Sequence, residues 1–167
     1  METLVTAAEM AEIDKKAQEQ GIPGMVLMEN AGQHAFRIWL RLALEDLAGS
    51  ESDADLSSID IGPRELGPVV AVAGAGNNGG DALVMARACS NLGIPVTAVL
   101  SKRELKGSAE EQHRIIRSMG LDLCYWDDSE AREAVATARW IFDGVAGTGI
   151  RGELRGSALE LVEAINE

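Results

Sequence analysis

The sequence predicts an α/β fold in which two N-terminal helices precede a doubly wound, mostly parallel sheet with helices on both faces. From Pro68 onward, short runs of apolar, β-branched residues alternate with longer segments of helical spacing. Such alternation is typical of parallel strands joined by right-handed crossovers. In addition, glycine-rich turns follow the first and the last of these strands, where a Rossmann-like, three-layer α/β/α domain binds its ligands.

Two helices are expected before the sheet. The segment Thr6–Glu9 matches a capping box at the start of the first helix, and Gly21 is placed to end it. After a turn at Pro23–Gly24, apolar residues recur at helical spacing over 28–42. The apolar faces of these helices predict either a packing cap over the sheet or a dimer face.

The remaining elements follow an irregular segment. Residues 49–67 are rich in Ser, Asp and Glu and show no clear period, which predicts a mobile surface loop. Beyond it, periodicity distinguishes strands from helices. The expected strands are 69–73, 95–100, 121–125 and 139–143, and the expected helices are 80–92, 108–119, 129–137 and 157–165.

Length and composition limit the possible functions. The 167 residues fit a single domain, 1–167, and the formal net charge is −12. We therefore expect no binding to nucleic acid or to anionic membranes, which requires a basic surface. Cys89 and Cys124 are isolated and lack the spacing of a metal site. Since the N-terminus also lacks the pattern of a signal peptide, we expect a cytoplasmic protein.

The first glycine-rich turn carries a phosphate-binding pattern. An apolar strand ends at Ala73, and Gly74, Gly76 and Gly79 follow at the Gly-x-Gly-x-x-Gly spacing. Free N–H groups at a helix start point at bound anions, and Asp81 stands where a helix cap is expected. The pattern alone also fits a hairpin turn, but the segment that follows has helical rather than strand spacing.

A second glycine-rich stretch, 143–156, follows the last expected strand. In the strand order 3-2-1-4 the first and fourth strands are neighbours, so both glycine turns leave adjacent strands where the order reverses. The segment Gly147–Gly149 offers bare N–H groups, and Thr148 adds a hydroxyl, for a phosphate or a ribose. Asn78 and Asp143 would supply oxygen ligands to one cation, although Asp143 fits an Asx turn equally well.

Three segments together carry a resemblance to a known family. Leu27–Gly32, Gly74–Asp81 and Asp143–Gly152 are similar to motifs of the NAD(P)H-hydrate epimerase family, the YjeF N-terminal domain. The resemblance covers nearly the whole chain outside 49–67. It implies an isomerase of metabolite repair, which interconverts the R and S epimers of hydrated NADH or NADPH at the C6 hydroxyl.

The resemblance also implies which residues form the site. Asn78 and Asp143 would hold a potassium ion, which is the implied cofactor. We further expect a homodimer, with the hydrated dinucleotide as its small-molecule partner. The implied substrate-binding residues are Asn77, Asn78, Gly79, Gly80, Asp81, Gly147, Thr148, Gly149, Ile150, Arg151, Gly152 and Glu153.

The sequence departs from the family pattern after Glu167. Family members continue there into a strand and a turn whose aspartate contacts the substrate and whose Ser or Thr completes the potassium site. Asp60–Pro63 resembles that turn only superficially, so no role is transferred to it. We therefore expect a fragment of a longer polypeptide, in which a dehydratase domain can follow. Its acid/base residue would lie beyond Glu167, and residues 1–167 alone would epimerise poorly.

Two other functions stay open on sequence grounds. The same fold serves as a non-catalytic scaffold for dimerisation and RNA binding in an mRNA-decapping enhancer. The intact Asn77–Asp81 segment and the acidic balance favour the enzyme over such a scaffold. A dinucleotide-dependent dehydrogenase would need an acidic residue after the second strand, where the sequence has Ser101 and Lys102 instead.

Overall fold

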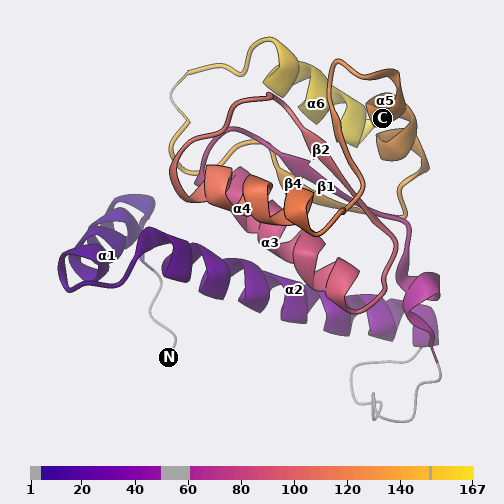
Figure 1. Cartoon of the computed structure of the whole chain (residues 1–167), viewed down its shortest axis with the longest axis horizontal. Helices are drawn as coiled ribbons and strands as arrows, with labels where there is room; N and C mark the ends of the chain where they lie inside the picture. The colour runs from indigo at the N-terminus through magenta and orange to yellow at the C-terminus, as the bar shows by residue number, and fades with distance from the viewer. Residues whose placement is uncertain (1–4, 50–60, 151) are drawn as a thin grey trace.

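A computed structural model describes residues 5–49, 61–150 and 152–167 of the chain (Figure 1). Four parallel strands form its sheet in the order β3-β2-β1-β4, which confirms the predicted topology. The strands are β1 (Val69–Ala73), β2 (Val96–Leu100), β3 (Leu123–Tyr125) and β4 (Trp140–Gly144).

Every predicted helix is present, with its ends displaced by a few residues. The third helix begins at Asn77 rather than at 80, because the glycine-rich turn itself forms its first turn. The helices are α1 (Ala7–Glu19), α2 (Gly24–Ala48), α3 (Asn77–Asn91), α4 (Gly107–Ser118), α5 (Ser129–Thr137) and α6 (Ser157–Asn166).

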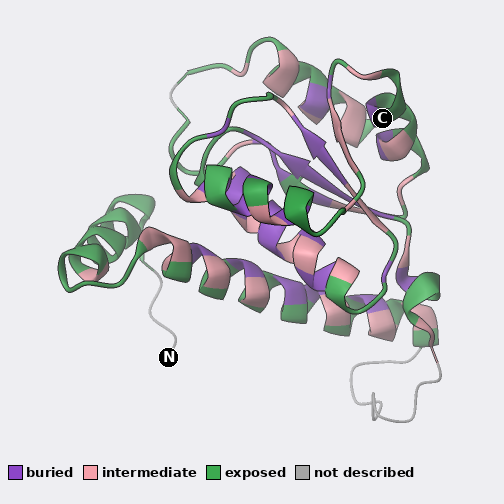
Figure 2. Ribbon diagram, in the orientation of Figure 1, coloured by how far each residue is buried: buried purple, intermediate pink, exposed green. Residues whose placement is uncertain are grey.

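Two layers of helices cover the sheet, as the sequence predicts for an α/β/α fold. Helices α2, α3 and α4 lie on one side, and α5 and α6 lie on the other (Figure 1). Every residue of β1 is buried, because this strand has a neighbour on each side and helices over both faces (Figure 2). The carboxyl end of β1, where the first glycine loop begins, is therefore held in the centre of the molecule.

The buried face of helix α2 matches the predicted stripe of Met28, Ala31, Ala35, Ile38, Trp39 and Leu42 only in part, since Met28 and Trp39 are buried. Ile38 and Leu42 of the predicted stripe are 46% and 50% exposed, whereas the buried face runs from Met28 through Gly32 to Ala43. The reason is a close contact with α3: a Cβ at Gly32 would lie 2.5 Å from the Cβ of Val84. A glycine at the contact lets the two helices approach, which apolar periodicity alone does not reveal.

Aromatic side chains fix the far end of α2 on the sheet. Trp39 meets Phe142 of β4 edge-on, with ring centroids 4.9 Å apart, and meets Trp140 in the same manner at 6.2 Å. Contacts of this kind stabilise a fold by about 0.5–1.5 kcal/mol each beyond the area that they bury. Helix α2 is thus anchored to both α3 and β4.

Helix α1 does not cap the sheet, so that part of the prediction is wrong. Its capping box between Thr6 and Glu9 is present, and Gly21 follows its end with a φ of 96°. No residue of α1 is buried, and the helix is exposed along its length (Figure 2). It lies beside the start of α2, at the left of Figure 1, on the side of the molecule that carries the glycine loops.

The irregular segment before the sheet is partly ordered. Residues 50–60 lie outside the described part of the chain, but Pro63–Leu66 form a turn of 3-10 helix, η2, and Leu66 is buried in the core. The expectation of a loop up to Gly67 is therefore wrong for its last residues. Within the described residues, no helix has the length and hydropathy needed to cross a membrane.

Candidate functional site

The two glycine loops leave the sheet side by side. The N–H of Gly74 donates to the carbonyl oxygen of Gly144 at 2.9 Å, and a Cβ at Gly74 would lie 2.0 Å from the carbonyl oxygen of Val145. Only glycine permits two backbones to approach this closely. The predicted convergence of the loops at the carboxyl ends of β1 and β4 is therefore confirmed.

The start of α3 presents backbone donors to this edge of the sheet. Gly76 is the N-cap, and no side chain accepts from the first turn. Among the described residues, the N–H groups of Asn77, Asn78 and Gly79 have no hydrogen-bond partner. Such N–H groups attract anions. The prediction that Asp81 caps the helix is wrong, because the helix begins earlier and Asp81 lies in its second turn.

The side chain of Asn78 joins the two loops. Its Nδ2 donates to the carbonyl oxygen of Ala146 at 2.9 Å and lies 3.4 Å from that of Asp143. The carboxylate of Asp143 accepts from the N–H of Val145 at 3.0 Å, which is the Asx turn that the sequence left open. Asn78 and Asp143 are thus brought together, as predicted.

The donor set around Asn78 fits a hard cation. If the side-chain amide of Asn78 rotated by half a turn, its Oδ1 would take the place of Nδ2 beside the backbone carbonyl oxygens of Ala146 and Asp143. The carboxylate of Asp143 has a second oxygen that does not take part in the Asx turn. Oxygen ligands that include carbonyl groups suit potassium. Within the described residues, no group of three or more His, Cys, Asp or Glu side chains could hold a metal ion.

A crevice of about 630 Å³ lies between the two loops and α1. It is lined by most of the residues expected to bind substrate. Gly80 is buried instead against Met28, and Gly152 and Glu153 are exposed and outside the lining. Arg151 lies outside the described residues. The expected residues that line the crevice are Asn77, Asn78, Gly79, Asp81, Gly147, Thr148, Gly149 and Ile150.

The carboxyl group of Asp81 is the most perturbed acid in this crevice. Burial, and next the negative charge of Asp14 on α1, raise the pKa of Asp81 from its ordinary value of 3.8 to about 6. Because the pKa is higher in the folded state, protonated Asp81 favours folding. The contribution of protonated Asp81 to the free energy of unfolding is fully present below about pH 3.8 and is lost as the pH rises through about 6.

We expect Asp81→Asn to remove this pH dependence. Above pH 6 the substitution should stabilise the protein by about 1 kcal/mol, after allowance for the part of the carboxylate that water screens. At roughly pH 4 it should change the free energy of unfolding little, since Asp81 is then protonated. Urea unfolding of both proteins at the two pH values measures the difference. An equal effect at both would contradict the raised pKa.

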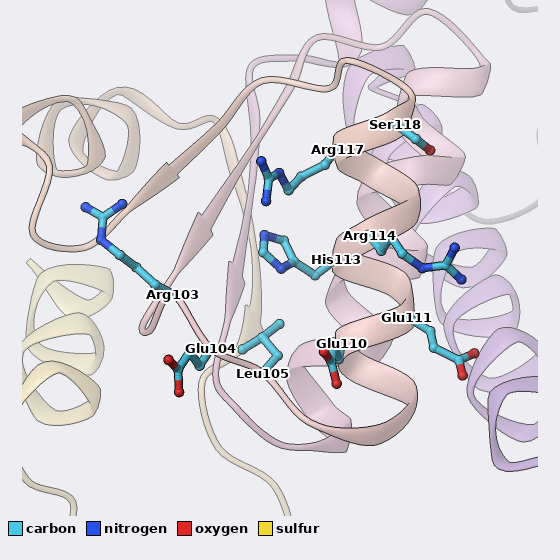
Figure 3. A pocket seen from close by; sticks show the side chains of 9 residues that line it. All are labelled: Arg103, Glu104, Leu105, Glu110, Glu111, His113, Arg114, Arg117 and Ser118. Carbon is cyan, nitrogen blue, oxygen red and sulfur yellow. The ribbon is translucent and has the colours of Figure 1, made fainter.

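A larger cavity, of about 910 Å³, lies between α4 and the loop that follows β2, and it contains none of the predicted site residues. His113 and Arg117 of α4 point toward the loop that carries Arg103, whereas Arg114 points away (Figure 3). His113 is 8% exposed, and its Nε2 lies 3.4 Å from the hydroxyl oxygen of Tyr125. Arg103 is itself paired with Asp127 and Asp128.

The arrangement of the two loops agrees with a family comparison. Residues 24–167 match the family model described as YjeF-related protein N-terminus. The chain belongs to this family.

Relatives of this YjeF-related chain carry names of two kinds. A protein of Rhodopirellula baltica named NAD(P)H-hydrate epimerase is 32% identical over 97% of this chain and 59% of that protein. One of Cenarchaeum symbiosum with the same name is 34% identical over 97% of this chain and 67% of its own length. A Bifunctional NAD(P)H-hydrate repair enzyme Nnr of Thermanaerovibrio acidaminovorans is 32% identical, and the chain covers 27% of it.

The chain therefore spans between about a quarter and two thirds of the length of these relatives.

A solved structure confirms the YjeF-related fold. The crystal structure of yeast ynu0, YNL200c, aligns with a TM-score of 0.72 and 23% identity. The alignment covers 98% of this chain and 65% of that chain.

The wall of the crevice that α1 forms was not predicted from the sequence. Helix α1 contributes Ala7, Met10, Ala11 and Asp14, which recur at helical spacing and so lie on one face. The sequence had placed Met10 on a packing face together with Ile13 and Ala17, whereas Met10 lines the crevice. Leu154 also lines the crevice, from the end of the second glycine loop.

Proposed function

We propose that this chain is an NAD(P)H-hydrate epimerase, which interconverts the R and S epimers of hydrated NADH and NADPH at C6. The observation that carries the proposal is the crevice between the two glycine loops, which collects eight of the residues that the family motifs assign to substrate. The names of the Rhodopirellula baltica and Cenarchaeum symbiosum relatives support the same activity.

The crevice offers separate partners for the parts of a dinucleotide. The uncapped N–H groups at the start of α3 suit the diphosphate, because their partial positive charge is not neutralised by a side chain. The second loop adds Thr148, whose hydroxyl suits a ribose, and Ile150, which is 45% exposed and suits the face of a ring. The acidic chain can therefore bind an anion through backbone groups alone.

A potassium ion would be held by Asn78 and Asp143, with the backbone carbonyl oxygen of Ala146 as a further ligand. When bound, the ion supplies positive charge beside the phosphate-binding N–H groups. Asn78 would then connect the ion, the first loop and the second loop.

A homodimer is the assembly that we propose. Val26, Ile38 and Leu42 on α2 are each between 45% and 50% exposed and are available to a second copy of the chain. The cytoplasmic location and the lack of binding to nucleic acid stay predictions from the sequence.

The experiment that tests the function uses one purified epimer of hydrated NADH. The chain, in potassium buffer, should convert it slowly, as the sequence predicts for residues 1–167, but still faster than the buffer alone, as followed by chromatography of the two epimers. The same assay with hydrated NADPH measures which dinucleotide is preferred. Conversion no faster than in buffer, together with no binding by calorimetry, would contradict the proposal.

A further inference from the structure

Two hollows adjoin each other at the start of α3. Besides the crevice between the glycine loops, a second hollow of about 520 Å³ follows α1, and we call it the α1 hollow. Ala11, Asp14 and Asn77 line both of them. The α1 hollow continues from there along the helix to Lys15, Gln18 and Glu19.

The two volumes suit a dinucleotide that is divided at its diphosphate. Sites for small molecules typically measure about 300–1,000 Å³, so each hollow has room for one nucleoside. The N–H of Asn77, which has no hydrogen-bond partner among the described residues, lies where the hollows adjoin. A helix start with free N–H groups suits the diphosphate that joins the two nucleosides.

The difference in burial assigns one nucleoside to each hollow. The crevice reaches the buried residues Gly79 and Val145, whereas all six residues that line the α1 hollow are exposed. A reacting ring needs the position from which more water is excluded. The hydrated nicotinamide therefore belongs in the crevice, and the adenosine belongs in the α1 hollow.

The charged side chains of the α1 hollow leave one negative charge uncompensated. Lys15 pairs with Glu19 at 3.8 Å, and Lys16, the other lysine of α1, pairs with Glu12 at 2.9 Å. The carboxylate of Asp14 accepts no hydrogen bond and forms no ion pair within the part of the chain that the structure describes. Asp14 is thus available to a ligand.

The place of Asp14 suits the ribose of the adenosine. In a dinucleotide this ribose follows the diphosphate directly, and Asp14 lines both hollows where they adjoin. A carboxylate accepts a hydrogen bond from the 2′-hydroxyl of NADH, whereas the 2′-phosphate of NADPH is usually bound by an arginine. A 2′-phosphate beside Asp14 would place like charges together, which lowers its affinity.

We propose that the α1 hollow binds the adenosine half of the substrate, and that Asp14 makes the chain select hydrated NADH over hydrated NADPH. This inference rests on the proposed epimerase function and deepens it, because it names the preferred substrate. Asp14 determines specificity here and takes no part in the chemical step.

ADP and its 2′-phosphorylated analogue test the inference without any reaction. In calorimetry the parent protein should bind ADP about 3- to 30-fold more tightly than the analogue, as expected for charges that water partly screens. The preference should shrink in about 1 M salt, which screens charges beyond roughly 3 Å. In amide NMR spectra, ADP should shift Asn77 and the residues of α1 between Ala11 and Glu19.

Asp14→Lys should abolish or reverse this preference, with Glu12→Lys as its matched control. Both changes replace an exposed acid of α1 by lysine, but Glu12 lines neither hollow. The control should keep the preference of the parent. Since the two ligands differ only in the 2′-phosphate, any effect of Asp14→Lys on Asp81 cancels in the ratio of their affinities.

Equal affinities in the parent, or an equal change of the ratio in the two variants, would overturn the inference. Tighter binding of the 2′-phosphorylated analogue would overturn it as well and would assign the phosphate to Lys15. A parent that epimerises hydrated NADH and hydrated NADPH with equal kcat/KM would refute the selectivity and support the proposed function. A parent that epimerises neither, but binds ADP along α1 with the expected preference, would refute the function and support the adenosine site.

Discussion

Gly79→Ala is expected to destabilise the protein by about 3 kcal/mol or more, because overpacking against backbone cannot be relieved by rotating a side chain. A Cβ at Gly79 would lie 2.0 Å from the carbonyl oxygen of Gly74 and 2.8 Å from its carbonyl carbon and its nitrogen. Either the loop after β1 or the start of α3 would have to move. Urea unfolding of the variant measures the loss, and failure to fold at all would agree with it.

Gly76→Ala is the matched control for this prediction. A Cβ at Gly76 would meet nothing within 4 Å, and its backbone is extended, which any residue adopts. We expect the free energy of unfolding to change by about 0.5 kcal/mol or less, since only the N-cap preference is altered. Equal losses in the two variants would show that the close approach of Gly79 to Gly74 does not exist.

Asn78→Leu is expected to have the second large effect, on both stability and ligand binding. Leucine has a similar volume but cannot donate to the carbonyl oxygens of Ala146 and Asp143, so these lose their partner. The cost of unpaired, partly buried carbonyl groups is about 1–3 kcal/mol. In addition, thermal stabilisation by potassium in the parent protein should disappear in the variant.

Asn77→Leu serves as its control for stability. Asn77 is exposed, and among the described residues its side chain makes no hydrogen bond. Its replacement should change the unfolding free energy by less than about 0.5 kcal/mol and should leave the potassium effect in place. If a large organic cation stabilised the parent as well as potassium does, a specific ion site at Asn78 would be excluded.

The sheet and both glycine loops could be predicted from the sequence, because each depends on a local pattern. Apolar runs such as Val69–Ala73 are too short for a buried helix, and their alternation with helical segments predicts parallel strands, for which 3-2-1-4 is the commonest doubly wound order. That order alone places Asn78 beside Asp143. The convergence of the loops needed no knowledge of side-chain packing.

The errors concern contacts between elements distant in sequence. Gly32 allows α2 to approach α3, and this contact moves the buried face of α2 away from the stripe that contains Leu42. Gly79 lines the crevice where substrate binding is expected, and the close approach of the carbonyl oxygen of Gly74 is a second reason for a glycine there, which the sequence did not reveal. In both cases the close contact depends on the absence of a Cβ atom, which the periodicity of apolar residues in the sequence does not reveal.

Asp81 shows why the candidate site was only partly predicted. Its place after a glycine-rich turn suggested a helix cap, but a helix that begins at Asn77 turns its side chain into the crevice instead. Asp14 gave no signal of its own, because a single acid on an amphipathic helix is usually solvated. Only the position of α1 beside the loops brings the two together.

The central claim is that hydrated dinucleotide binds between the two glycine loops. Amide NMR spectra of isotopically labelled protein, recorded during addition of hydrated NADH in potassium buffer, test it most directly. We predict that the largest shifts fall on the backbone amides of Gly76–Asp81 and Val145–Ile150, with smaller ones on the inner face of α1. Shifts confined to the cavity beside Arg117 and His113, or no saturable shifts at all, would contradict it.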